Sequence, residues 1–100
     1  MALAYITCKN RKEAIKISNH LLKKKLIGCA NFFPIESSYW WDNKIVNENE
    51  FVIIAKITKK DFEVLVKETE KIHSYKVPCI LNIGCKCNTK FDNWLKDIVN

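Results

Sequence analysis

The sequence predicts an α+β fold, because stretches typical of strands and of helices alternate along its 100 residues. Two observations define the architecture. The elements follow the order β-α-β-β-α-β plus a last helix, and right-handed crossovers then give a four-stranded antiparallel sheet with two helices on one face. The two middle strands are also long, about twelve residues each against a usual five or six. We therefore expect a ferredoxin-like sandwich with an extended central hairpin and an extra C-terminal helix.

The predicted elements, in chain order, are a strand over residues 3–8, a helix from 11 to about 25, strands over 29–40 and 44–57, a helix over 62–73, a strand over 79–83 and a helix from 89 onward. The strands are apolar runs rich in β-branched and aromatic residues, and the helices carry apolar residues three and four apart. Asn10 with Glu13, and Thr58 with Asp61, are typical of capping boxes at the starts of the first two helices. Gly28 is expected to end the first helix.

The central hairpin is marked by the aromatic run Tyr39-Trp40-Trp41 and by the turn signal Asp42-Asn43 that follows it. Short polar side chains tolerate the backbone conformations that a tight turn needs. Three large aromatic side chains at the tip need a surface to bury against, and an isolated hairpin offers none. An exposed apolar overhang is an aggregation hazard unless a partner covers it. We therefore expect a closed oligomer of this chain.

Composition favours a single cytoplasmic domain spanning residues 1–100. No apolar run is long enough for a transmembrane helix, and no export signal precedes Lys9. The five cysteines are an odd number and are expected to be free, mostly buried thiols in a reducing compartment. The net charge of +6 comes from lysines spread along the whole chain, which favours a solvated surface over a nucleic-acid interface.

Several short segments, in a characteristic order and spacing, point to a known family. They are Thr7-Cys8 with Glu13-Ala14, Leu26–Asn31 with Pro34, Ser38–Lys44, Lys56-Ile57-Thr58, His73–Pro78 and Trp94-Leu95. Together they resemble the CutA divalent-cation tolerance family over almost the whole chain. The resemblance implies a cytosolic homotrimer of ferredoxin-like subunits, similar in architecture to PII-type signalling trimers. It also implies a link to metal tolerance, binding of copper or another divalent ion, no organic cofactor and no established reaction.

The resemblance implies Cys8 and His73 as metal ligands, and thiolate with imidazole suits copper or zinc. A complete site needs three or four ligands. Cys79 is the third candidate, because it closely follows the loop of His73 and stands where the family usually has glutamate. The alternatives are that Cys8 is a core thiol, that His73 caps the second helix, and that Cys79 is a small apolar residue at the start of a strand.

The resemblance further implies a cleft between subunits, lined by Tyr39, Trp41, Lys56 and Tyr75. Lys56 interrupts an apolar strand, which is costly unless its ammonium group is paired or lies at an edge. The alternative for Lys56 is a salt bridge to a carboxylate such as Glu36.

Cys85-Lys86-Cys87 is a second candidate for metal binding. In a strand-like stretch the two thiols share a face and can reach one soft ion. Most cysteine metal hooks have two intervening residues, however, and this chain has no second pair to complete a four-cysteine site. The alternative is that both cysteines fill a turn before the last helix.

Enzymatic and nucleic-acid functions find little support. A Cys8–His73 nucleophile pair would need a group that orients the imidazole and donors that bind an oxyanion. The strand Phe51–Lys56 lacks the motif of RNA-recognition domains, and no glycine-rich anion loop of the acylphosphatase type surrounds Arg11. We expect a trimeric metal-binding protein rather than an enzyme. The alternative is a PII-like module whose clefts bind a small ligand or a partner protein.

Overall fold

Alternating burial along the first strand organises the fold. The computed structural model describes residues 1–99, in which β1 (Ala2–Cys8) buries every second side chain. β1 lies inside a four-stranded sheet of order β2-β3-β1-β4, together with β2 (Cys29–Trp41), β3 (Lys44–Ile57) and β4 (Ile80–Gly84). Every neighbouring pair of strands is antiparallel. This topology confirms the predicted ferredoxin-like sandwich.

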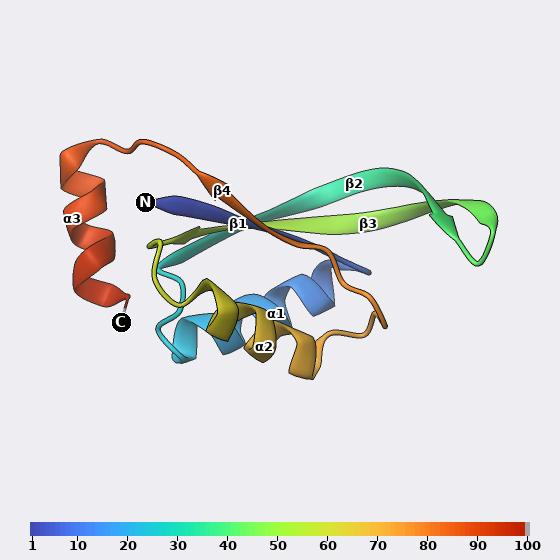
Figure 1. Cartoon of the computed structure of the whole chain (residues 1–100), viewed down its shortest axis with the longest axis horizontal. Helices are drawn as coiled ribbons and strands as arrows, with labels where there is room; N and C mark the ends of the chain where they lie inside the picture. The colour runs from blue at the N-terminus through green and yellow to red at the C-terminus, as the bar shows by residue number, and fades with distance from the viewer. Residues whose placement is uncertain (100) are drawn as a thin grey trace.

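The helices α1 (Arg11–Lys23) and α2 (Phe62–Ile72) lie side by side on one face of the sheet (Figure 1). The core forms between these helices and the buried side chains of β1 and β3, including Ile6, Ile17, Leu21, Ile53 and Leu65. α3 (Thr89–Ile98) lies across the end of the sheet, next to the N-terminus. No helix within residues 1–99 is long and apolar enough to cross a membrane.

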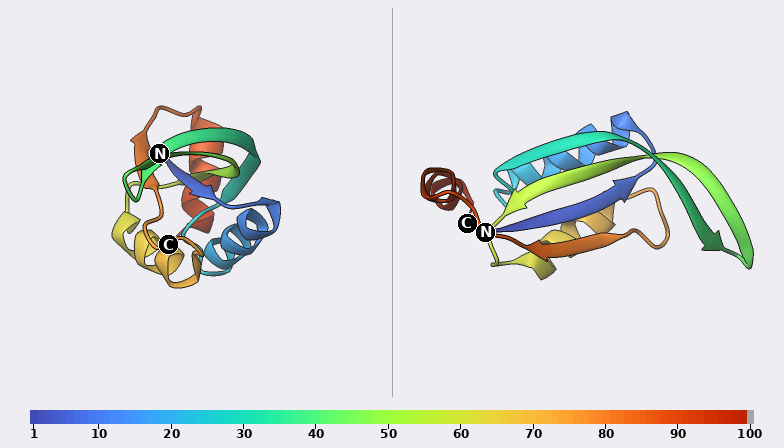
Figure 2. Two further views of the ribbon diagram at one scale, coloured as in Figure 1. Left: turned by 90° about the vertical axis from the view of Figure 1, so that its right-hand side faces the viewer. Right: turned by 90° about the horizontal axis from the view of Figure 1, so that it is seen from above.

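The hairpin of β2 and β3 extends well beyond the rest of the sheet. β1 pairs with β3 only from Phe51 to Ile57, so the half of β3 nearer the turn pairs with β2 alone. Asp42 and Asn43 form the turn with φ values of 52° and 59°, the left-handed conformation that a two-residue hairpin turn requires. The molecule is consequently elongated, 45 × 25 × 21 Å, and the tip of the hairpin curves away from the sheet (Figure 2).

Pro34 lies within β2 without ending it, opposite Phe51 of β3. Proline has no N–H group to donate, so a strand tolerates it where that position does not pair with a neighbour. β2 is an edge strand, and its second edge has no partner within the described part of the chain. The predicted strand therefore continues through the proline.

The predicted end of the first helix at Gly28 is wrong. α1 ends at Lys23, and the residue in the left-handed conformation is Lys25, with φ of 57°. Gly28 has a different role, because a Cβ atom at this position would lie 2.4 Å from Cδ1 of Leu95. The missing side chain thus allows α3 to approach the start of β2, and only the folded structure reveals this need.

The predicted capping box of Thr58 and Asp61 is also wrong. Asp61 occupies the N-cap position of α2 but has a φ of 58°, and its side chain makes no capping hydrogen bond. The hydroxyl of Thr58 is buried and has no hydrogen-bond partner within residues 1–99. The predicted box places Thr58 at the N-cap and Asp61 in the first turn, but α2 begins only at Phe62, so Thr58 lies before the helix and cannot cap it.

Candidate functional site

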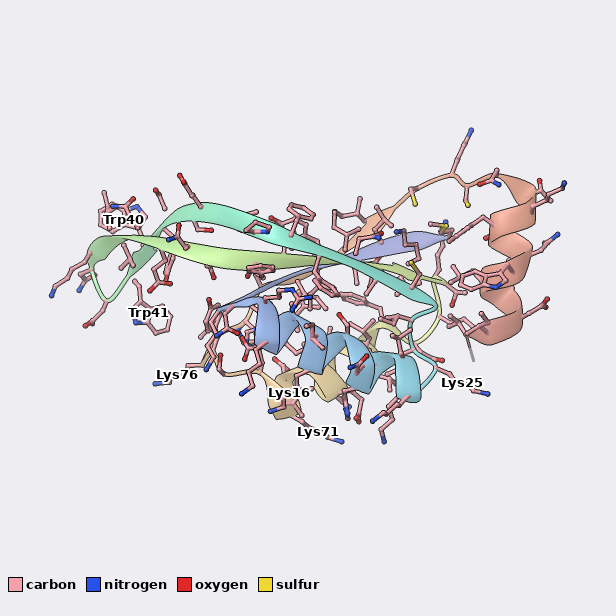
Figure 3. All side chains as sticks on the ribbon, turned by 180° about the vertical axis from the view of Figure 1, so that it is seen from behind. Lys16, Lys25, Trp40, Trp41, Lys71 and Lys76 are labelled. Atoms are coloured by element: carbon pink, nitrogen blue, oxygen red, sulfur yellow. The ribbon has the colours of Figure 1, made fainter. Side chains whose placement is uncertain are left out.

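A cavity of about 750 Å³ opens between the projecting hairpin and the loop that joins α2 to β4. The hairpin contributes aromatic and acidic side chains, and the loop contributes Tyr75, Lys76 and Cys79. Trp40 and Trp41 lie at the tip and point away from each other, with Trp41 on the same side as Lys76 (Figure 3). Trp40 is 71% exposed and Trp41 49% exposed, so the aromatic tip is open to a partner.

Two tyrosine–glutamate pairs form the polar part of the cavity. The hydroxyl of Tyr39 donates to Oε2 of Glu48 at 2.7 Å, and the hydroxyl of Tyr75 donates to Oε2 of Glu50 at 2.5 Å. The hydrogen bond to Glu48 raises the pKa of Tyr39 to about 12. Burial, together with the Glu50 carboxylate, raises the pKa of Tyr75 further. Both tyrosines are therefore neutral donors, and the two carboxylates give the cavity its negative charge.

His73 fixes the start of the loop. It follows the last residue of α2, and its backbone N–H donates to the carbonyl of Thr69. Its Nδ1 accepts a hydrogen bond from the backbone N–H of Tyr75 at 3.0 Å, and its Nε2 lies 2.8 Å from the carbonyl oxygen of Thr7. Because Nδ1 accepts, Nε2 carries the ring proton and donates it to Thr7. The expectation that His73 caps the second helix is thus met, and both ring nitrogens are already engaged.

Glu13 holds the same loop from the other side. Its carboxylate, almost fully buried, accepts from the backbone N–H groups of Lys9 at 3.0 Å and Ser74 at 2.9 Å. Its own N–H donates to Oδ1 of Asn10 at 2.9 Å, which confirms the predicted cap. Burial alone would raise the pKa of Glu13, but the hydrogen bonds from Ser74 and Lys9 outweigh burial and lower it. An ionised carboxylate therefore ties the start of α1 to the loop.

Cys8 is a core thiol. Its side chain is fully buried, and Sγ lies 3.7 Å from the carbonyl oxygen of Phe51 and 3.8 Å from that of Asn10. Burial, reinforced by the charges of Glu13 and Glu50, raises its pKa to about 12. The thiol hydrogen-bonds to carbonyl groups rather than to His73, so the structure provides no activated Cys8–His73 nucleophile.

The sheet separates two of the three predicted metal ligands. Thr7 pairs with Cys79 through the hydrogen bond from the Thr7 N–H to the Cys79 carbonyl, so their side chains share the face that lines the cavity. Cys8 follows Thr7 in the strand and points to the opposite face, toward the helices. Among residues 1–99 there is no group of three or more His, Cys, Asp or Glu side chains that could hold a metal ion.

Three of the four residues predicted for the cleft meet in the cavity: Tyr39, Trp41 and Tyr75. Lys56 does not line this cavity within one protomer. It lies near the far end of β3, where its ammonium group donates to Oδ1 of Asn31 and lies 3.8 Å from Sγ of Cys29. The partner of Lys56 is therefore an amide on the neighbouring strand, and the proposed salt bridge to Glu36 does not form.

All five cysteines are free, but the expectation that most are buried is wrong. Only Cys8 is buried, whereas Cys79 is exposed and Cys29, Cys85 and Cys87 are half-buried. Sequence reasoning also missed the two carboxylates of the cavity. Glu48 and Glu50 alternate in the polar run Asn47-Glu48-Asn49-Glu50, and this spacing places both side chains on one face of the hairpin.

Comparison with known proteins gives consistent results for sequence and structure. The sequence pattern described as CutA1 divalent ion tolerance protein matches residues 2–98. The divalent-cation tolerance protein CutA of Thermotoga maritima is 38% identical over 99% of both chains. Its counterpart from Archaeoglobus fulgidus is 40% identical over 95% of this chain and 94% of its own.

Solved structures agree with these sequence matches. The periplasmic divalent cation tolerance protein CutA from Archaeoglobus fulgidus has a TM-score of 0.96 and 37% identity, with 100% of both chains covered. CutA1 from Pyrococcus horikoshii has a TM-score of 0.95 and 31% identity, covering 100% of this chain and 99% of the other.

Proposed function

Because this chain belongs to the CutA1 divalent ion tolerance family, we propose that it is a cytoplasmic, non-catalytic homotrimer that binds copper or another divalent transition metal at the cavity beneath its hairpin. One observation carries the metal-binding proposal. The exposed thiol of Cys79 shares the cavity with the carboxylates of Glu48 and Glu50. The thiolate would supply a soft ligand and the two carboxylates would attract the cation, although within residues 1–99 these three side chains do not form one ligand group.

The proposed trimer is supported by surfaces that one chain leaves uncovered. Trp40 and Ile45 at the hairpin tip and Leu81 of β4 are large apolar side chains that are exposed in the protomer. Both edge strands, β2 and β4, have a free edge within residues 1–99. In a cyclic trimer, each copy would offer one patch to each of two neighbours, so these surfaces would be covered without leaving an open end.

The proposed ligands differ in how readily they can bind. Cys79 is exposed and needs no rearrangement. His73 would bind through Nδ1 after giving up the hydrogen bond from Tyr75. Cys8 must first lose a proton that a pKa of about 12 retains, and it lies on the other face of the sheet. We therefore propose Cys79 as the principal ligand, His73 as the second, and Cys8 as the last to be engaged.

Isothermal titration of copper(I), copper(II) and zinc into the reduced protein tests this proposal. Cys79→Ser and His73→Ala should weaken binding, whereas Cys29→Ser, a half-buried thiol outside the cavity, should not. Binding should also weaken as the pH falls, since protons compete for thiolate and imidazole. Unchanged affinity in both Cys79→Ser and His73→Ala would contradict the proposed site.

The cavity itself favours a second candidate, a PII-like module that binds a small ligand or a partner. Its volume of about 750 Å³ and its aromatic walls suit an organic ligand better than a bare ion. The two functions respond differently to Trp41→Ala. This change should abolish binding of an organic ligand that stacks on the ring, but it should leave the affinity of a metal held by Cys79 nearly unchanged.

A further inference from the structure

The segment that joins β4 to α3 carries two thiols that the cavity does not use. Residues 85–88 form no turn and no bend, so Cys85 and Cys87 lie two positions apart in an open stretch of backbone. Cys85 and Cys87 are half-buried and Lys86 between them is exposed, which is the alternation of an extended segment whose side chains two positions apart project to the same side. The N–H of Cys85 donates to the carbonyl of Met1 at 3.4 Å, which attaches the segment to the start of β1. The two cysteines therefore do not lie in a turn, contrary to the alternative considered from the sequence.

The hydrogen bonds around Cys87 leave a helix uncapped. Asn88 occupies the N-cap position of α3, with extended backbone suited to capping, but its side chain makes no capping bond. Its Oδ1 instead accepts from the thiol of Cys87 at 3.5 Å. The side chain of Asn88 thus makes no bond to the first N–H groups of α3, and its oxygen instead accepts the weak hydrogen bond of the thiol.

We propose that Cys85 and Cys87 together bind one copper(I) ion between their two sulfurs. Copper(I) is soft and accepts two-coordinate binding by thiolates, whereas zinc would need two further ligands that this segment lacks. On binding, both thiols release their protons, two Cu–S bonds form, and no electron is transferred. The resulting complex carries one negative charge, which Lys86, Lys90 and the N-terminus of α3 offset.

Binding also has a structural consequence at α3. Once Cys87 has lost its proton, Oδ1 of Asn88 no longer receives that hydrogen bond and is free to accept from the N–H of Phe91 in the first turn of the helix. Copper(I) binding therefore allows Asn88 to cap α3, the helix whose Leu95 lies against Gly28.

This site is separate from the proposed site in the cavity. Cys79 pairs with Thr7 near one end of β1, whereas Cys85 contacts Met1 at the other end. The two sites should therefore respond to different substitutions, and a result that refutes one proposed site does not refute the other.

The test is a titration of copper(I) into the full-length reduced protein without oxygen, in competition with a coloured copper(I) chelator. The Cys85→Ser/Cys87→Ser double variant should lose one tightly bound equivalent per chain. Each single variant should lose that same equivalent, because one thiol cannot hold a two-coordinate ion. Cys29→Ser is the matched control and should keep it, while Cys79→Ser reports on the cavity alone.

Hydrogen exchange gives a second measurement that does not depend on the stoichiometry. Copper(I) should slow exchange of the Phe91 amide in the native chain. Asn88→Ala should keep the bound copper but lose this protection. If the double variant binds as many equivalents as the native chain with equal affinity, or if each single variant loses only part of one equivalent, the paired site is refuted.

Discussion

At the scale of single residues, the loop between α2 and β4 is held by a few buried polar contacts rather than by packing alone. Glu13 accepts from Lys9 and Ser74, and His73 joins Thr7 to Tyr75. Two of these part-buried hydrogen bonds, from Ser74 to Glu13 and from His73 to Thr7, join groups that are distant in the sequence. Losing one partner leaves the other unsatisfied, which costs more than the bond itself contributes.

Glu13→Gln should lower the free energy of unfolding at neutral pH by about 1–3 kcal/mol, because an amide presents an N–H group to one of two backbone donors. The pKa of Glu13 is lowered below its usual 4.5, so its ionised form stabilises the fold. That contribution is complete above pH 4.5 and is lost as the pH falls through the folded-state pKa. Denaturant titrations at several pH values should show a shallower acid decline in the variant. Glu70→Gln, on the exposed face of α2, is the control.

The two glycines provide a matched pair of substitutions. Gly28→Ala should destabilise the protein by about 1–3 kcal/mol, because the added Cβ collides with Leu95 and either α3 or β2 must shift. Gly84→Ala meets no atom within 4 Å and should leave stability nearly unchanged. Thermal unfolding of both variants checks the prediction. Equal effects at the two positions would mean that α3 does not pack on Gly28.

At the scale of elements, the sequence predicts correctly those features that depend on neighbouring residues alone. Asp42-Asn43 specified its turn, because short polar residues are among the few that accept left-handed backbone at both positions. The role of Gly28 was predicted wrongly, because glycine is required there by the close approach of Leu95, which lies sixty-seven positions later in the chain. The acidic side of the cavity was missed for a related reason. In the sequence, Glu48 and Glu50 have the pattern of solvent-exposed strand residues, and only the fold brings the loop of Tyr75 next to them.

The helix caps differ in a way that mutation can measure. Asn10→Ala should destabilise the protein by about 1 kcal/mol, because its side chain satisfies the N–H of Glu13 at the start of α1. Asn88→Ala, without copper, should cost much less, since Asn88 makes no capping bond at α3. Chemical denaturation of the metal-free variants gives both values. A comparable loss at Asn88 would indicate that α3 is capped without metal.

At the scale of the whole molecule, the protomer has a long hairpin that its own helices do not cover. The helices pack against the end of the sheet where all four strands pair, and the hairpin projects past them (Figure 1). Its tip carries Trp40 and Trp41 on opposite sides (Figure 3). The protomer buries its own core but leaves the apolar side chains of the hairpin exposed, which is the physical reason for the proposed trimer.

Light scattering should give a mass three times that of the 11.7 kDa chain. Trp41→Ala should weaken assembly by about 2 kcal/mol or more, as truncation of a central interface aromatic does, and should shift the mass toward the monomer on dilution. Lys16→Ala, on the exposed face of α1, is the control and should not change the mass. A native protein that scatters as a monomer at all concentrations would contradict the trimer.

The inner position of β1 has a consequence for how the protein is made. Of the four strands of this sheet, β1 is synthesised before the others, yet it pairs with β3 and with β4, the third and the fourth in chain order. The apolar run Ala2–Cys8 can pair with β3 once Ile57 is free, at the same stage as the hairpin, but its other edge stays unpaired until β4 has emerged. Nascent chains that stall before Ile80 would expose one side of β1 to other chains. The interval before β4 is made is thus the period in which one edge of β1 is open to misassembly.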